Sequence, residues 1–197
     1  MKTIAILIPL SWDTVPKQFF FSMLNMMAYA RGRYELIVLT ARAALLSKMH
    51  EMMVAQALES DVDYILHLDA DQEYPADTPE RMMKHIDDGK DVVMGLVPSN
   101  SINGYVAYDF KDDAGKITPK DIKPDSGIVE VGCTGMGGLM VNPDVYRKID
   151  RPYFFGLASY AGPDVNLCYK CMKKGIRCWI DTDLRFGHII PSVKYDG

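Results

Sequence analysis

The chain has 197 residues, with 26 acidic and 22 basic side chains, a formal net charge of -4 and 48% hydrophobic residues. This length fits one compact domain, and the apolar content excludes an intrinsically disordered chain. The acidic balance argues against a nucleic-acid partner, because neutralising phosphates requires a basic face.

The N-terminal segment is apolar and ends at Pro9, which predicts a buried first strand. It is too short for the apolar core of a signal peptide with its cleavage site. No apolar run approaches the ~18 residues that a membrane span needs. We therefore expect a cytoplasmic protein without a membrane span.

Strand and helix patterns then alternate through the first half of the chain. Helices are expected at 19–29, 42–58 and 79–88, and further strands at 34–40, 63–68 and 91–97. In the second helix the apolar positions follow helical spacing and predict one buried face, made of Leu45, Met49, Met52 and Met53. Such alternation is typical of βαβ units and a parallel sheet.

The alternation breaks after Pro98. Short strands at 105–110 and 127–131 lie in a segment rich in Gly, Asp, Lys and Pro and predict a small antiparallel excursion. The remaining expected elements are a strand at 135–141, helices at 143–149 and 163–174, and a strand at 176–180. The sequence thus predicts an α/β fold in which residues 1–197 form a single Rossmann-like domain, with a mostly parallel central sheet flanked by helices.

The four cysteines are Cys133, Cys168, Cys171 and Cys178. The spacing of Cys168 and Cys171, with Cys178 close behind, is compatible with zinc. The last expected helix places Cys168 and Cys171 on one apolar face, where free thiols behave as small hydrophobic side chains. We interpret the cysteines as core residues, with a zinc site or a disulfide as the alternative.

An acidic pair, Asp69-Ala70-Asp71, directly follows the strand expected at 63–68. In open α/β sheets ligands bind beyond the carboxyl ends of the strands. Two carboxylates at such a point suit a hard divalent cation that also binds substrate phosphates, whereas turn or capping chemistry is the simpler alternative. Asp61 and Asp63 precede their strand, but Asp181 and Asp183 also follow one, so position does not exclude the latter.

The segment from Asp61 to Pro75 resembles the acidic-pair region of GT-A fold glycosyltransferases, notably the family 2-like enzymes. Further motifs resemble this family in the same order along the chain: Ile8-Pro9-Leu10, Thr40-Ala41-Arg42, the glycine-rich 135–141, Gly162-Pro163-Asp164 and Gly187-His188. Each motif is short and common, and their order and spacing make the resemblance specific.

The resemblance implies metal-dependent transfer of a hexose from a nucleotide-diphosphate sugar to a hydroxyl group on a glycan, small molecule or protein. It implies Mn²⁺ or Mg²⁺ held by Asp69, Asp71 and His188. Residues implied near the donor are Pro9, Leu10, Arg42, Asp69, Ala70, Asp71, Gly137 and Gly138. Asp164 is implied as the general base if the reaction inverts the anomeric centre, and as an orienting group if it retains it.

Each assignment has a structural alternative. Asp164 sits where a carboxylate complements a helix dipole, and His188 fits an ordinary loop histidine. Arg42 fits a surface ion pair, and the glycines 137 and 138 also fit close backbone packing.

Two other functions remain open, namely a sugar-phosphate nucleotidylyltransferase and a non-catalytic nucleotide-sugar or carbohydrate-binding module. The first usually has a glycine-rich N-terminal loop, and residues 9–18 contain no glycine. The loops 99–126 and 151–163 are expected to cover the site. Because little chain is left for an acceptor domain, we expect a small acceptor, or one presented by a partner or by a second copy in a homo-oligomer.

Overall fold

The structure is a computed structural model that describes residues 1–11, 13–99, 104–156 and 161–189. Its helices are α1 (Lys17–Ala30), α2 (Leu46–Glu59), α3 (Thr78–Asp87), α4 (Pro143–Lys148) and α5 (Pro163–Lys173). The longer strands are β1 (Thr3–Pro9), β2 (Glu35–Ala41), β3 (Tyr64–His67), β5 (Val92–Leu96), β6 (Ala107–Phe110), β8 (Ile128–Val131) and β11 (Cys178–Arg185). The short strands are β4 (Gln72–Glu73), β7 (Ile117–Pro119), β9 (Cys133–Thr134), β10 (Leu139–Val141) and β12 (Gly187–His188).

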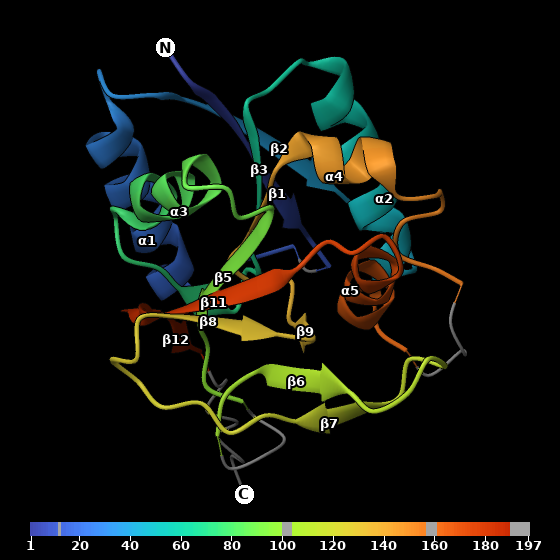
Figure 1. Ribbon diagram of the computed structural model, residues 1–197. Helices are drawn as coiled ribbons and strands as arrows, with labels where there is room; N and C mark the ends of the chain where they lie inside the picture. The colour runs from blue at the N-terminus through green and yellow to red at the C-terminus, as the bar shows by residue number, and fades with distance from the viewer. Residues whose placement is uncertain (12, 100–103, 157–160, 190–197) are drawn as a thin grey trace, which may run out of the picture.

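The central sheet has seven strands in the order β2-β1-β3-β10-β5-β11-β8. Only β10 and β8 run against the direction of their neighbours. The α/β fold with a mostly parallel sheet is therefore confirmed. Figure 1 shows α1 and α3 on one side of this sheet and α2, α4 and α5 on the other. The antiparallel excursion is also confirmed, as the small sheet β7-β6-β9, but the strand expected at 127–131 is β8 and belongs to the edge of the central sheet instead.

The central strands are apolar along their whole length because helices cover both faces of the sheet. All four residues of β3 are buried, as are all five of β5. Strand β10 is inserted between them, so that the loop before it reaches the carboxyl end of β3, where the Gly138 amide donates to the His67 carbonyl at 2.8 Å. This insertion brings the glycine-rich segment to the edge where the acidic pair lies.

The buried face predicted for α2 is partly wrong. The helix begins at Leu46, and Leu45 and Met52 are exposed. The buried face is made of Met49, His50, Met53, Val54 and Ala57. The apolar spacing was compatible with two neighbouring faces, and packing against β1 and β2 selects the one that contains His50.

The interpretation of the cysteines as core residues is confirmed, because all four are free and buried. No helix in the described ranges combines the length and the apolar character needed to cross a bilayer.

Two histidines are buried side by side under the sheet edge. His50 and His67 are completely inaccessible to solvent, and their Nδ1 atoms lie 3.2 Å apart. His67 Nε2 lies 2.7 Å from the Tyr146 hydroxyl, whereas His50 Nε2 has no hydrogen-bond partner in the described part of the chain. Burial lowers the pKa of His50 to about 4, and burial together with His50 lowers that of His67. Both rings are therefore neutral in the folded protein at pH 7.

We expect this pair to make the protein sensitive to acid. Below the ordinary histidine pKa of 6.5 the unfolded chain binds protons that folded His50, with its pKa of about 4, does not. The free energy of unfolding is fully retained above pH 6.5 and declines as the pH falls towards 4, by about 2 kcal/mol at pH ~5 for His50 alone. Urea unfolding near pH 7 and near pH 5 measures this loss. His50→Leu should show a smaller loss, and an unchanged one would contradict the assignment.

Candidate active site

The acidic pair lies in the loop that leaves the carboxyl end of β3. Tyr74 shapes this loop, because its hydroxyl accepts a hydrogen bond from the Asp69 amide at 2.9 Å and lies 3.1 Å from the Asp69 carbonyl oxygen. Tyr74 is itself buried and packs edge-to-face on Phe186. The position of Asp69 is therefore set by the core as well as by the strand it follows.

Two cavities of about 210 Å³ each meet at Asp69. The first is lined by Pro9, Leu10, Ser11, Thr14, Val15, Leu46, Asp69, Ala70 and Asp71. The second is lined by Leu46, Asp69, Gln72, Met94, Val97, Val106, Gly135, Met136, Gly137, Pro163, Asp164 and His188. The structure thus divides most of the predicted site residues between two adjoining compartments, with Asp69 in the wall of both.

The Asp69 carboxyl is in an unfavourable place for a lone negative charge. Burial, as the largest cause, and the nearby carboxylates of Asp71 and Asp164 raise its pKa to about 7, whereas His188 lowers it. A cationic ligand beside this carboxyl would relieve the repulsion and favour its ionised form.

His188 faces the acidic pair from β12, which pairs with β4. Its Nδ1 lies 3.1 Å from the Pro98 carbonyl oxygen, which can only accept, so Nδ1 carries a proton. Its Nε2 lies 3.7 Å from Asp71 Oδ2. Metal-binding histidines usually have this arrangement, in which a backbone carbonyl fixes the ring through its other nitrogen.

Two carboxylates and a neutral imidazole suit Mn²⁺ or Mg²⁺ in chemistry. As they stand, however, no three His, Cys, Asp or Glu side chains in the described ranges are close enough together to hold a metal ion. His188 Nε2 and Asp71 Oδ2 lie 3.7 Å apart, and Asp69 is the carboxyl whose raised pKa a nearby cation would lower. The donor set therefore fits a divalent cation, although its side chains would have to converge further.

Asp164 occupies the first turn of α5, which begins at Pro163. The carboxylate accepts a hydrogen bond from the Val165 amide at 2.9 Å, which stabilises its ionised form. Burial outweighs this bond and raises the pKa of Asp164 to about 6. Helix capping and a role in the second cavity are thus compatible, because the same carboxyl lines that cavity.

Gly137 and Gly138, in the loop before β10, have different roles. A Cβ on Gly137 would lie 2.2 Å from Gln72 Nε2 and 2.6 Å from Asp69 Oδ2, so its missing side chain leaves room for the acidic pair. Gly138 has a φ of +80° and packs against the Phe186 ring, where a Cβ would come within 2.1 Å. Gly137 lines the second cavity, whereas Gly138 is not among its lining residues and packs against Phe186.

Arg42 is not brought into either cavity. It follows β2 and forms an exposed ion pair with Asp13 at 2.6 Å. Asp181 and Asp183 lie elsewhere as well, in a cavity with basic residues of α3. Asp181 Oδ2 is held by Arg81 at 3.2 Å and by His85.

Sequence reasoning missed Gln72, Leu46 and Met136 as lining residues. Gln72 immediately follows the acidic pair, which was an available signal, and its Oε1 lies 3.2 Å from the Tyr74 hydroxyl. The sequence does not distinguish the apolar lining residues Leu46 and Met136 from residues of the hydrophobic core. Of the loops predicted to cover the site, residues 100–103 and 157–160 lie outside the described ranges.

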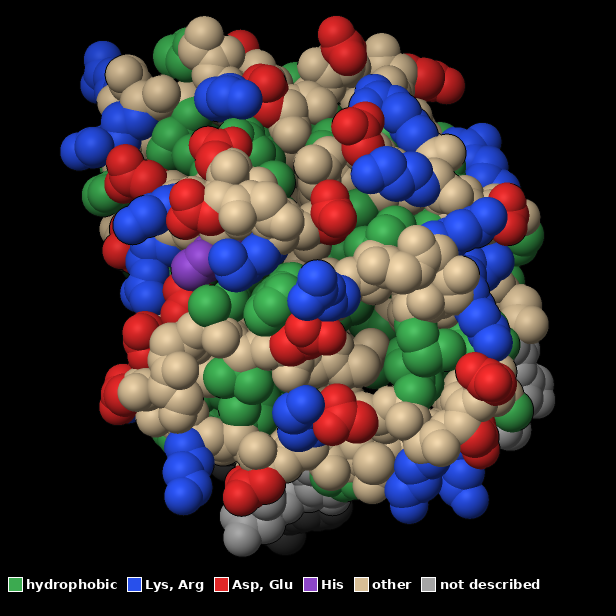
Figure 2. Space-filling model, viewed as in Figure 1, with side chains coloured by type: hydrophobic (Ala, Val, Ile, Leu, Met, Phe, Trp, Pro, Cys, Tyr) green, Lys and Arg blue, Asp and Glu red, His purple; other side chains and the backbone are tan. Residues whose placement is uncertain are grey.

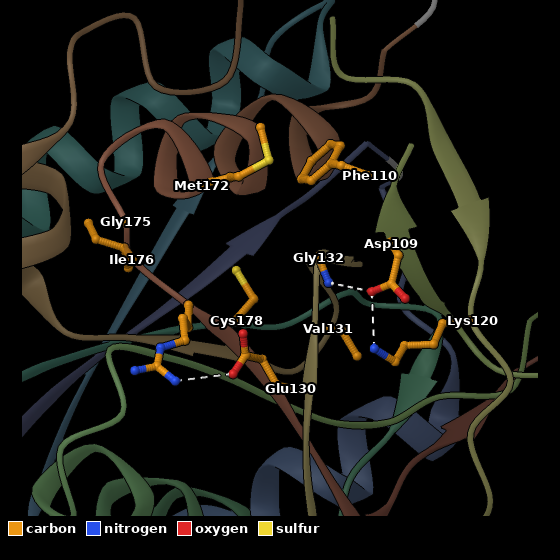
Figure 3. Close-up of a pocket in the computed structure, with 11 residues that line it drawn as sticks. Asp109, Phe110, Lys120, Glu130, Val131, Gly132, Met172, Gly175, Ile176 and Cys178 are labelled. Atoms are coloured by element: carbon orange, nitrogen blue, oxygen red, sulfur yellow. Dashed lines mark hydrogen bonds and ion pairs between the residues drawn. The ribbon is translucent and has the colours of Figure 1, made fainter. Parts of the chain in front are cut away.

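A larger cavity, of about 430 Å³, lies away from these residues, between β6, β8 and the end of α5 (Figure 3). Its charged side chains already pair with each other: Lys120 lies 3.1 Å from Asp109 and Arg177 lies 3.3 Å from Glu130. The rest of its lining is mostly apolar, and it contains none of the predicted site residues. We therefore place the candidate active site at the two cavities that share Asp69.

The comparisons with known proteins point to the same region. The model of the family "Glycosyl transferase family 2" matches residues 53–142, which include the acidic pair, Gly137 and Gly138. The chain is thus similar to family 2 glycosyltransferases over a little less than half of its length. The match leaves out Pro9, Asp164 and His188, which the tertiary structure brings to the same edge.

Solved structures support the GT-A-like fold of this chain. The crystal structure of A197 from STIV is 22% identical, with a TM-score of 0.68, covering 96% of this chain and 86% of that one. A Drosophila beta-1,4-galactosyltransferase 7 mutant, in complex with manganese, UDP-Gal and xylobiose, is 14% identical, with a TM-score of 0.51, covering 96% of this chain and 71% of that one. No curated protein matches the chain in sequence.

Proposed function

We propose that this protein is a metal-dependent glycosyltransferase that moves a hexose from a nucleotide-diphosphate sugar to an acceptor hydroxyl. The observation that carries the proposal is the position of Asp69 between two cavities, with Asp71 in the wall of one and Asp164 in the wall of the other. The Drosophila neighbour, bound to manganese, a UDP-sugar and an acceptor sugar, supports the proposal. We also propose that the protein is located in the cytoplasm.

In this proposal the first cavity holds the nucleotide. Its floor is formed by Pro9 and Leu10 at the end of β1, with Val15 and Leu46 as apolar walls for a base. The diphosphate would lie beside the acidic pair, since Asp69 and Asp71 line this cavity. Arg42 would reach this cavity only after leaving its ion pair with Asp13.

Asp69, Asp71 and His188 would hold Mn²⁺ or Mg²⁺ at this point. A bound divalent cation offsets the negative charge that develops on the departing diphosphate. The chain itself places the Asp71 carboxylate and the Nε2 atom of His188 close together. The hydrogen bond from Nδ1 of His188 to the Pro98 carbonyl oxygen fixes the imidazole ring.

The second cavity would hold the sugar and the acceptor. Asp164, whose pKa is about 6, is mostly ionised at pH 7 and can take a proton from an acceptor hydroxyl. The deprotonated oxygen would bond to the anomeric carbon as the bond to the diphosphate breaks. This is the general-base role expected for an inverting reaction; in a retaining one Asp164 would orient the acceptor.

Calorimetric titration with UDP and with GDP, with and without Mn²⁺, tests the metal site. We expect Mn²⁺ to strengthen nucleotide binding by about 10–100-fold, and Asp71→Asn to remove most of that gain. Asp183→Asn is the matched control, because it makes the same change in a different cavity. A nucleotide affinity that is unchanged by Mn²⁺ and by Asp71→Asn would overturn the metal role.

Two assays separate the proposal from its alternatives. Release of free nucleotide from a nucleotide sugar would argue against a non-catalytic binding module. Pyrophosphate production from a nucleoside triphosphate and a sugar phosphate would instead favour a nucleotidylyltransferase.

A further inference from the structure

Exposed apolar side chains are confined to one part of this protein. Every large hydrophobic side chain that is exposed in the described ranges belongs to the first 52 residues. They are Met1, Val15, Phe20, Phe21, Leu24, Met27, Val38, Leu45, Leu46 and Met52. Met1 precedes β1 and Val15 follows it, and the others belong to α1, the edge strand β2, α2 and the segment between β2 and α2. Helices α1 and α2 lie on opposite sides of the sheet (Figure 1).

Helix α1 contributes the most regular part of this surface. Phe20, Leu24 and Met27 recur at helical spacing, with Phe21 beside them, and each is between 45% and 58% exposed. The buried residues Phe19, Met23 and Met26 cover the opposite side, so α1 has two apolar faces, with the exposed polar residues Gln18 and Asn25 on the side between them. A helix of this kind is normally buried on both faces, in a core or in lipid.

The charges in helical register with the exposed row are basic, whereas the acidic Glu80 of α3 contacts α1 at Tyr29, outside this row. Lys17 and Arg31 stand at the two ends of the exposed row, in helical register with it, and neither forms an ion pair in the described part of the chain. Helix α1 contains no acidic residue. Residues 1–52 hold six basic and three acidic side chains, whereas the rest of the chain holds 16 basic and 23 acidic ones. Figure 2, by contrast, shows acidic and basic side chains interspersed over the face that it displays.

We propose that the exposed row of α1, named here the α1 stripe (Lys17, Phe20, Phe21, Leu24, Met27 and Arg31), binds the surface of a bilayer that contains anionic lipids. A helix of 14 residues is about 20 Å long and can lie flat in the headgroup region with its apolar side chains inserted. Its basic ends would then face lipid phosphates. A second copy of the chain fits less well, because two basic stripes facing each other would repel.

The α1 stripe adjoins the proposed nucleotide cavity. Val15, two residues before α1, lines that cavity and is itself partly exposed. A protein docked through α1 would therefore have this cavity close to the lipid surface. The docking proposal does not depend on the proposed reaction, and its test needs no substrate.

Co-sedimentation with vesicles tests the docking surface. The full chain is mixed with vesicles of phosphatidylcholine alone and with vesicles that also contain about 30% phosphatidylserine. We expect binding to the anionic vesicles that weakens at high salt. Phe20→Ser combined with Leu24→Ser, and Lys17→Glu combined with Arg31→Glu, should each weaken it at least tenfold. Lys123→Glu combined with Lys148→Glu, the same charge change at exposed lysines outside the first 52 residues, should have little effect.

Circular dichroism and thermal unfolding show whether each variant is folded, as expected for substitutions at exposed positions. Absence of binding to either vesicle by the folded wild-type chain would overturn the proposal. So would equal loss in the Lys123/Lys148 variant, which would indicate nonspecific attraction. A wild-type dimer in solution that dissociates in the Phe20/Leu24 variant would assign the α1 stripe to self-association instead.

Discussion

Replacing Asp164 by Asn should lower the turnover number for glycosyl transfer by about 10²–10⁴-fold, the usual contribution of a general base. Asn retains the size of the side chain and can still accept a hydrogen bond from the Val165 amide through its oxygen, so α5 should begin normally. Nucleotide binding should change little, because Asp164 does not line the first cavity. Steady-state kinetics together with calorimetric nucleotide binding measure the two effects separately.

The pH profile gives an independent check on this role. Burial raises the pKa of Asp164 to about 6, so the wild-type rate should fall as the pH drops through that value and the base becomes protonated. With saturating Mn²⁺, which would keep Asp69 ionised despite its pKa of about 7, the residual rate of Asp164→Asn should lack this decline. Asp144→Asn, the same change in the first turn of α4, is the control for an effect on helix starts. A loss of less than tenfold in Asp164→Asn would point to acceptor orientation, as expected for a retaining reaction.

Replacing Gly137 by Ala should lower kcat/KM by at least about 10²-fold without unfolding the protein. The backbone of Gly137 does not have the left-handed conformation, so alanine is allowed there. Its Cβ, however, would lie 2.6 Å from Asp69 Oδ2 and 2.2 Å from Gln72 Nε2, and both groups would have to move. A displacement of about 1 Å at a catalytic group can cost this much in rate.

Gly135→Ala is the matched control, two residues away in the same loop. Its Cβ would meet only a side-chain methyl of Val106 at 3.1 Å and more distant atoms of Met94, which can adjust. Its loss of kcat/KM should be far smaller. Metal-dependent nucleotide binding should be weakened in Gly137→Ala and preserved in Gly135→Ala. Equal kinetic effects in both variants would show that the loop is sensitive as a whole, and that Gly137 has no specific role in placing Asp69.

Much of the fold followed from local patterns. The helices and longer strands were predicted within a few residues, because each is long enough to show periodicity or a continuous apolar run. The strands β4, β7, β9 and β12 have two or three residues each and leave no such pattern. The error in α2 has a similar origin, because Met52 and Met53 are equally apolar and only the sheet decides which of them is buried.

The chemistry of the site was also readable from the sequence, through Asp69 and Asp71 after a buried strand and Asp164 at a helix start. Their convergence was not, because residues 9, 69, 137, 164 and 188 meet only after β10 has been inserted antiparallel between β3 and β5. The exposure of α1 could not be predicted from its sequence either, because apolar residues occur on more than one face of this helix. Only the packed structure shows that Phe20, Leu24 and Met27 face outward.

The sequence by itself determined the order of elements, the apolar strands and the identity of the acidic groups, since these depend on neighbours along the chain. The tertiary structure alone decided which carboxyl is buried, which glycine leaves room for it and that Arg42 pairs with Asp13. Burial and charge proximity depend on distances between segments far apart in the chain, and these exist only once the sheet has assembled.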